Sequence, residues 1–157
     1  MQHVRALVED QSYLRHFWHP VCTVKELEQS ASGIGPIGRV LLDEPIVIVR
    51  LDGKIVAMRD RCAHRFAKLS AGKVIGDRLQ CPYHGWEYEA DGKCGFIPAC
   101  PNDPIPKKAL TPSYECEVRY DIVWVRLDSS WGVTKIPYCS AWANPEFKKI
   151  IIAEPYD

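Results

Sequence analysis

Two short segments, each with one cysteine and one histidine, constrain this chain more than any other feature. Cys62-Ala63-His64 has the pattern Cys-x-His, and Cys81-Pro82-Tyr83-His84 has the pattern Cys-x-x-His. Residues 65–80, which separate them, contain neither residue type. Thiolate sulfur and neutral imidazole nitrogen are both strong metal ligands. A fold that brings the two segments together would place four ligands, Cys62, His64, Cys81 and His84, around one metal centre.

Two kinds of metal centre use two thiolates and two imidazoles. One is a 2Fe-2S cluster in which two cysteines hold one iron and two histidines hold the other. The second is a structural zinc site, in which cysteine is normally grouped with cysteine and histidine with histidine. Here each segment supplies one of each, which favours the 2Fe-2S cluster. Neutral imidazoles reduce the negative charge around such a cluster and raise its reduction potential, which suits one-electron transfer.

Composition narrows the remaining function classes. The chain has 157 residues, the usual size of one domain, with 20 Lys+Arg against 20 Asp+Glu. This balance gives no electrostatic reason to expect nucleic acid or an acidic membrane as partner. No apolar run approaches the roughly 18 residues of a membrane span, and the first residues lack the pattern of a secretory signal. We therefore expect a cytoplasmic location.

Cysteine usage also indicates metal chemistry rather than disulfides. Seven cysteines cannot all pair within one chain, and a domain of this size does not need disulfides to fold. The cysteines outside the two segments have no ligand spacing, and we expect them to be buried or idle thiols: Cys22, Cys94, Cys100, Cys116 and Cys139. His16 and His19 lack accompanying ligands as well, so packing or surface roles are favoured for them.

The pattern of apolar residues predicts a mainly β fold with antiparallel neighbours. We expect strands at residues 40–43, 46–51, 54–59, 114–119, 122–127 and 149–153. Asp52-Gly53 fits a tight type I′ hairpin turn, and Tyr120-Asp121 joins the second pair. Five prolines make residues 98–112 irregular.

The N-terminal part of the chain is expected to be helical, over residues 13–36. Residues 12–18 form a short helical segment that stops at Pro20. Thr23 and Glu26 have the spacing of a capping box, which predicts a helical turn through Leu27.

The residues around the four candidate ligands resemble the pattern of Rieske iron–sulfur proteins. The surrounding sequence, over residues 13–157, is similar to the N-terminal domain of Rieske non-heme iron oxygenase alpha subunits. The resemblance lies in Cys62-Ala63-His64-Arg65, Leu69-Ser70, Gly72-Lys73 and Cys81-Pro82-Tyr83-His84-Gly85-Trp86.

The resemblance implies a fold and a ligand assignment. It implies one Rieske domain over residues 1–157, an antiparallel β-sandwich with short N-terminal helices and an inserted cluster-binding subdomain. The cluster-binding loops are expected at residues 61–88. By the same resemblance, Cys62 and Cys81 ligate one iron of a Rieske-type 2Fe-2S cluster, and His64 and His84 ligate the other.

Membership in the oxygenase group would also imply partners. The cluster would accept electrons from a reductase or ferredoxin and pass them to a mononuclear iron in a catalytic domain, for hydroxylation or demethylation of a small substrate. The full-length protein would be a possible homotrimer. Respiratory Rieske proteins carry additional cysteines and a serine near the cluster, where this chain has Ala67, Tyr83 and Trp86. Without that serine donor, we expect a reduction potential toward the low end of the Rieske range, near about −150 mV.

The chain departs from the oxygenase pattern after His84, where it contains no further histidine. A mononuclear iron held by two histidines and a carboxylate therefore cannot be assembled in the family's way, since His3, His16 and His19 all lie upstream. We expect the electron-transfer part of the enzyme, with the catalytic domain absent and no catalytic residue. The alternative is a stand-alone Rieske ferredoxin, although such carriers are usually shorter and lack the segments around residues 13–18 and after residue 128.

Residues beside the candidate ligands suggest two further features. Arg61, Arg65 and Lys68 form a positive rim that is either a docking site for a negatively charged redox partner or a solvated face. Four aromatic residues are expected to shield the cluster from water: Phe66, Tyr83, Trp86 and Tyr88.

Overall fold

Two antiparallel sheets make up the computed structural model, which describes residues 12–132 and 134–151. The larger sheet has the strand order β1-β10-β9-β4-β3-β2, and the smaller has the order β5-β6-β7-β8. The mainly β, antiparallel prediction is therefore confirmed. The strands of the larger sheet are β1 (His19–Thr23), β2 (Ile37–Leu41), β3 (Glu44–Leu51), β4 (Lys54–Arg59), β9 (Ser113–Arg119) and β10 (Ile122–Arg126). The smaller sheet contains β5 (Lys73–Ile75), β6 (Arg78–Gln80), β7 (Glu87–Tyr88) and β8 (Cys94–Phe96).

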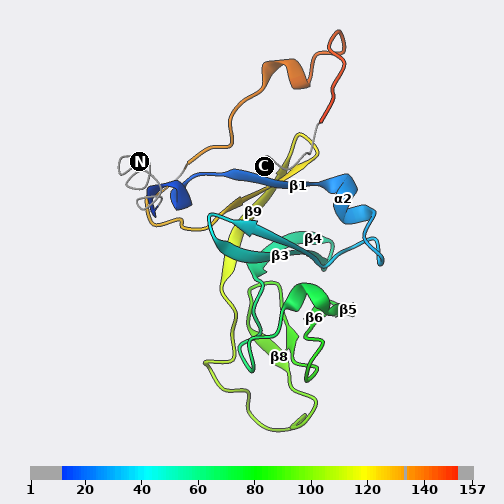
Figure 1. Ribbon diagram of the computed structural model, residues 1–157, viewed down its shortest axis with the longest axis vertical. Helices are drawn as coiled ribbons and strands as arrows, with labels where there is room; N and C mark the ends of the chain where they lie inside the picture. Colours follow the sequence, from blue (N-terminus) through cyan, green and yellow to red (C-terminus); the bar gives the residue numbers. More distant parts are fainter. Residues whose placement is uncertain (1–11, 133, 152–157) are drawn as a thin grey trace, which may run out of the picture.

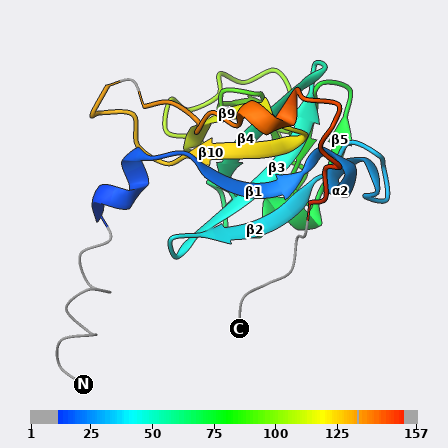
Figure 2. The same ribbon diagram turned by 90° about the horizontal axis from the view of Figure 1, so that it is seen from above.

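The smaller sheet is an insertion between two neighbouring strands of the larger one. Strands β4 and β9 pair with each other, yet all of β5 to β8 lies between them in the sequence. Figure 1 shows this inserted subdomain below the larger sheet. Viewed from above, the larger sheet is curved, and its edge strands β1 and β2 lie side by side (Figure 2). The proline-rich segment at residues 98–112, which connects β8 to β9, is irregular, as predicted.

Three hairpins of the larger sheet turn on pairs of residues with positive φ. Asp52-Gly53 (φ 47° and 70°) joins β3 to β4, and Tyr120-Asp121 (φ 62° and 57°) joins β9 to β10, both as predicted. Leu42-Asp43 (φ 48° and 62°) joins β2 to β3 in the same way. The prediction that this strand extends to residue 43 is therefore wrong. Strand β2 stops at Leu41 because the next two residues form the turn.

The N-terminal segment is only partly helical. The 3-10 helix η1 (Ser12–His16) and the helix α2 (Val24–Glu28) confirm two predicted turns, and α2 has the predicted capping box between Thr23 and Glu26. Between them, however, His19–Thr23 forms strand β1, which the helical prediction for residues 13–36 missed. Pro20 is tolerated in this strand because β1 is an edge strand, which pairs with β10 alone within the described part of the chain.

One other predicted strand is absent. Residues 149–151 are irregular, and Ile150 is 70% exposed. The rest of the predicted strand at residues 149–153 lies outside the described residues. The short 3-10 helices η2 (Leu69–Ala71) and η3 (Ser140–Trp142) complete the secondary structure. Across the two described ranges, no helix is long and apolar enough to cross a membrane.

Strand β3 separates two apolar cores. Its side chains point alternately to opposite faces, as in any strand. Ile46 and Ile48 pack into the core of the larger sheet with residues of β10. Val47, Val49 and Leu51 pack into a second core, which continues into the inserted subdomain and contains the two ligand cysteines predicted above. Burial on both faces explains why β3 is an almost unbroken apolar run.

A partly buried carboxylate links three strands of the larger sheet. Glu44 at the start of β3 accepts hydrogen bonds from Arg59 of β4 (2.5 Å, Nε to Oε1) and from the hydroxyl of Tyr114 of β9 (2.8 Å). Burial alone would raise the pKa of Glu44, but these hydrogen bonds outweigh it and hold the pKa below its ordinary value. Charged Glu44 therefore stabilises the fold at neutral pH.

Replacing Glu44 with glutamine is expected to lower the free energy of unfolding by about 1–2 kcal/mol at neutral pH. Because the folded-state pKa is lowered, this contribution is complete above the ordinary glutamate value of 4.5 and is lost as the pH falls through the folded pKa. Urea unfolding of both proteins, at neutral and acidic pH, measures the difference. A difference that stays constant with pH would contradict this, and Glu117→Gln, an exposed position on β9, is the matched control.

Candidate metal centre

The two predicted ligand segments fold into loops with the same backbone hydrogen bonds. In the first loop, the Cys62 N–H donates to the carbonyl of Ala67, and the Phe66 N–H donates to the carbonyl of Cys62 (both 2.9 Å). Counting from the cysteine, the bonds run from the first residue to the sixth and from the fifth back to the first.

The second loop repeats this pattern. The Cys81 N–H donates to the carbonyl of Trp86 (2.8 Å), and the Gly85 N–H donates to the carbonyl of Cys81 (3.2 Å). The fifth residue has a left-handed backbone in both loops, with φ of 59° at Phe66 and 72° at Gly85. Gly85 is also tightly packed, because a Cβ there would lie 3.0 Å from Cγ of Pro98. Glycine adopts this conformation without strain, whereas phenylalanine does not.

The loops bring the predicted ligands together in two pairs, cysteine with cysteine and histidine with histidine, while no group of three or more potential ligands among the described residues is placed to hold a single metal ion. Cys62 and Cys81 are 1% and 2% exposed and lie in the shared apolar core. Burial raises the pKa of Cys81, and a hydrogen bond between its thiol and that of Cys62 adds to the rise. The rings of His64 and His84 are 4.6 Å apart, centroid to centroid, with His64 half-buried and His84 exposed. The thiols therefore form the inner side of the site, and the imidazoles form the outer side.

The surroundings and the lowered pKa of His64 fit a metal ligand. Its Nδ1 is buried and has no hydrogen-bond partner among the described residues, which is costly for a polar atom unless something else binds it. The ring is stacked on Trp86 at 4.8 Å, with an angle of 3° between the planes. Desolvation, followed by the nearby His84 and Arg65, lowers the pKa of His64 and favours the neutral form that binds metals. Two thiols and two imidazoles in this arrangement fit a cluster with one sulfur-ligated and one nitrogen-ligated iron.

Tyr88 has a role that the sequence analysis missed. Its side chain is completely buried, and its hydroxyl oxygen accepts a hydrogen bond from the Ala63 N–H (2.9 Å). The O–H proton is therefore free to donate to Sγ of Cys62, which lies 3.1 Å away. Burial, followed by the contact with Cys62, raises the pKa of Tyr88, so the group stays protonated and remains a donor. No local pattern in the sequence indicated this contact, because Tyr88 lies 25 residues after Ala63.

The predicted aromatic shield is smaller than expected. Tyr88 is buried and Trp86 is half-buried, but Phe66 and Tyr83 are 62% and 65% exposed. Phe66 lies under the guanidinium of Arg61, which is 4.0 Å from the ring centroid. Tyr83 packs on the ring of His84, with the centroids 3.8 Å apart. Tyr83 therefore flanks one imidazole, whereas Phe66 packs against Arg61. The predicted positive rim of Arg61, Arg65 and Lys68 is exposed on the same loop.

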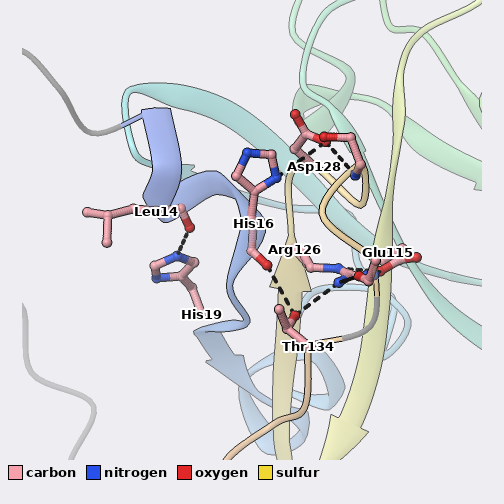
Figure 3. Close-up of polar contacts among 9 residues, drawn as sticks. Leu14, His16, His19, Glu115, Arg126, Asp128 and Thr134 are labelled. Atoms are coloured by element: carbon pink, nitrogen blue, oxygen red, sulfur yellow. Dashed lines mark hydrogen bonds and ion pairs between the residues drawn. The ribbon is translucent and has the colours of Figure 1, made fainter.

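His16 and His19 have separate structural partners (Figure 3). The buried ring of His16 stacks on Trp131 at 4.0 Å, and its Nδ1 lies 3.5 Å from a carboxylate oxygen of Asp128. Nε2 of His19 lies 2.8 Å from the carbonyl of Leu14. These contacts confirm packing roles. His3 lies outside the described residues.

The remaining cysteines are free thiols, as expected. Cys22 and Cys94 are buried, Cys100 and Cys116 are partly buried, and Cys139 is exposed.

Comparison with known families decides the nature of the site. The family described as the Rieske [2Fe-2S] domain matches residues 17–115, which include both loops. The chain belongs to this family. Its cofactor is therefore a Rieske-type 2Fe-2S cluster, and the alternative of a structural zinc ion falls away.

The relatives of this Rieske domain include demethylases and oxygenase components. Methylxanthine N1-demethylase NdmA of Pseudomonas putida is 56% identical over 97% of the chain, which covers 44% of that protein. Methylxanthine N3-demethylase NdmB of the same organism is 52% identical over 99% of the chain and 45% of the relative. The chain thus spans less than half the length of these relatives.

Solved structures show the same fold. The structure of NdmB from Pseudomonas putida CBB5 superposes with a TM-score of 0.86 at 56% identity, over 89% of this chain and 43% of that one. A dicamba monooxygenase with non-heme iron and dicamba superposes with a TM-score of 0.72 at 29% identity, over 84% of this chain and 39% of that one. The Rieske-type fold predicted from the sequence is confirmed.

Replacing Tyr88 with phenylalanine is expected to lower the reduction potential of the cluster. A hydrogen bond to a ligand sulfur stabilises the more negative, reduced state. If about 1 kcal/mol of its energy differs between the two states, the shift is about 40 mV for a one-electron couple. A potentiometric titration measures it. Tyr83→Phe, the same change at an exposed ring, is the control and should leave the potential unchanged. Equal potentials for Tyr88→Phe and the parent protein would contradict the role given to Tyr88.

Proposed function

We propose that this Rieske domain transfers single electrons within a Rieske non-heme iron oxygenase. It takes electrons from a reductase or ferredoxin and delivers them to a mononuclear iron in a catalytic domain. The observation that carries the proposal is the difference in burial between the two sides of the site. The cysteines are almost fully buried, whereas the two histidines meet at the surface and His84 is exposed. A partner protein can therefore approach the metal centre most directly from the imidazole side.

The proposal assigns a role to each ligand residue. Cys62 and Cys81 hold the inner iron, and His64 and His84 hold the outer iron. The bound cluster supplies reversible one-electron chemistry at a potential above that of all-cysteine clusters. The protein residues fix the two loops, exclude water from the thiolate side and expose one imidazole edge. No residue of this chain is proposed to act on a substrate.

The oxygenase assignment is supported by the length and identity of the relatives. Both N-demethylases contain a region similar to nearly the whole chain, including the segments around residues 13–18 and after residue 128. The alternative of a stand-alone carrier gives no reason for this extended match. We propose that the longer protein removes a methyl group from nitrogen of a small substrate, and that it acts as a homotrimer in the cytoplasm.

The ligand assignment is tested by replacing the two histidines with cysteine, as His64→Cys and His84→Cys in one protein. An all-cysteine cluster is expected, with a lower reduction potential and an electron paramagnetic resonance spectrum of the ferredoxin type. His19→Asn is the control, since His19 contacts only the carbonyl of Leu14 among the contacts described above. A spectrum of the Rieske type in the double variant would overturn the assignment.

Electron delivery is tested with a chimera that joins this chain to the catalytic part of methylxanthine N1-demethylase. With a reductase and NADH, the chimera is expected to release formaldehyde from a methylxanthine, in proportion to the electrons consumed. His84→Ala in the chimera should abolish this release while leaving substrate binding unchanged. A chimera that contains an intact cluster, is reduced by the reductase and yet releases no formaldehyde would favour the stand-alone carrier.

A further inference from the structure

We propose that Asp60 and Ser70 form a clamp that positions the first cluster loop. Neither residue is a metal ligand, and both lie at the base of the loop that carries Cys62 and His64. The inference rests on the proposed function only in taking Cys62 and His64 as metal ligands.

The clamp consists of two short hydrogen bonds to one carboxylate. The Ser70 N–H donates to Oδ1 of Asp60 (2.7 Å), and the Ser70 hydroxyl donates to Oδ2 (2.6 Å). Asp60 is 7% exposed, so both bonds are largely shielded from water. Because the two carboxylate oxygens bind two groups of the same residue, the clamp fixes the direction of Ser70 as well as its distance.

Both ends of the clamp are attached to rigid parts of the fold. The Asp60 N–H donates to the carbonyl of Pro45 in β3 (2.8 Å), which anchors the carboxylate to the larger sheet. Ser70 belongs to η2, and its neighbour Leu69 is completely buried in the core shared with the ligand cysteines. The clamp therefore joins the larger sheet to the inserted subdomain and closes residues 61–69 into a ring.

Ser70 packs against Gly38 of strand β2. A Cβ on Gly38 would be 2.9 Å from Oγ and 3.1 Å from Cβ of Ser70. Glycine at this position leaves the space that the serine side chain occupies. A larger residue would push Ser70 away from Asp60 without touching either metal ligand.

The first loop needs such support more than the second. Both loops require a left-handed residue at the same position, but the first uses Phe66 where the second uses Gly85. A left-handed conformation strains a residue with a side chain, and such strain persists only where the surroundings hold it. The clamp at the base of the loop is the constraint that holds it. Its loss is expected to let His64 move relative to His84.

The test compares Asp60→Ala with Asp60→Asn. Alanine removes both hydrogen bonds, whereas asparagine can accept from the Ser70 N–H and donate to the Ser70 hydroxyl, so the geometry is retained without the charge. Cluster loss under air, followed by visible absorbance, is expected to be about tenfold faster in Asp60→Ala, the usual effect of removing a group that orients a ligand. The electron paramagnetic resonance lines of this variant should broaden. Asp60→Asn should restore both the lifetime and the line width.

Three further variants make the result specific. Asp77→Ala, at an exposed aspartate in the turn between β5 and β6, is the control and should match the parent protein. Ser70→Ala removes one bond of the two and should give an intermediate lifetime, which keeps the test available if Asp60→Ala does not fold. Gly38→Ala should shorten the lifetime in the parent, but much less when combined with Ser70→Ala, because the two changes act on the same contact.

The outcomes separate the clamp from the proposed function. A parent protein without a Rieske signal would overturn the ligand assignment, and the clamp would fall with it. A parent protein with the Rieske signal, together with Asp60→Ala of equal lifetime and line width, would overturn the clamp alone. The clamp would also be overturned if Asp60→Asn lost its cluster as fast as Asp60→Ala. The hydrogen-bond geometry that asparagine retains would then have no effect on the lifetime of the cluster.

Discussion

The structure depends on the meeting of two loops that each carry one thiol and one imidazole. Each loop is shaped by the same pair of backbone hydrogen bonds around its cysteine, which directs the sulfur inward and the ring outward. Cys62 and Cys81 meet in the apolar core, and His64 and His84 meet at the surface. This division between a buried thiol side and an exposed imidazole side decides how a redox partner can reach the centre.

The remaining architecture supports these loops. Strand β3 is buried on both faces and carries the core of the larger sheet on one side and that of the inserted subdomain on the other. The subdomain leaves the larger sheet after β4 and returns at β9, two strands that pair with each other, so both of its ends are fixed. Tyr88 then connects the loops directly, since it belongs to β7 and contacts Cys62 and Ala63 of the first loop.

Sequence reasoning found the features that depend on local chemistry. The four candidate ligands, whose assignment stays a prediction, followed from residue type and spacing. The Asp52-Gly53 turn and the Thr23 capping box followed from local hydrogen bonding and are confirmed. It missed features that depend on distant partners. Strand β1 exists because β10 lies beside it, whereas residues 149–151 are irregular and pair with no strand among the described residues. The contact from Tyr88 to Cys62 joins residues far apart in the chain, so no local pattern indicated it.

The most direct test of this account is the electron paramagnetic resonance spectrum of the dithionite-reduced protein, with iron, zinc and acid-labile sulfide measured on the same sample. The account predicts a rhombic signal whose average g value lies below that of an all-cysteine cluster, with equal amounts of iron and sulfide and little zinc. An absent signal with stoichiometric zinc, or the signal of an all-cysteine cluster, would contradict a cluster held by two cysteines and two histidines.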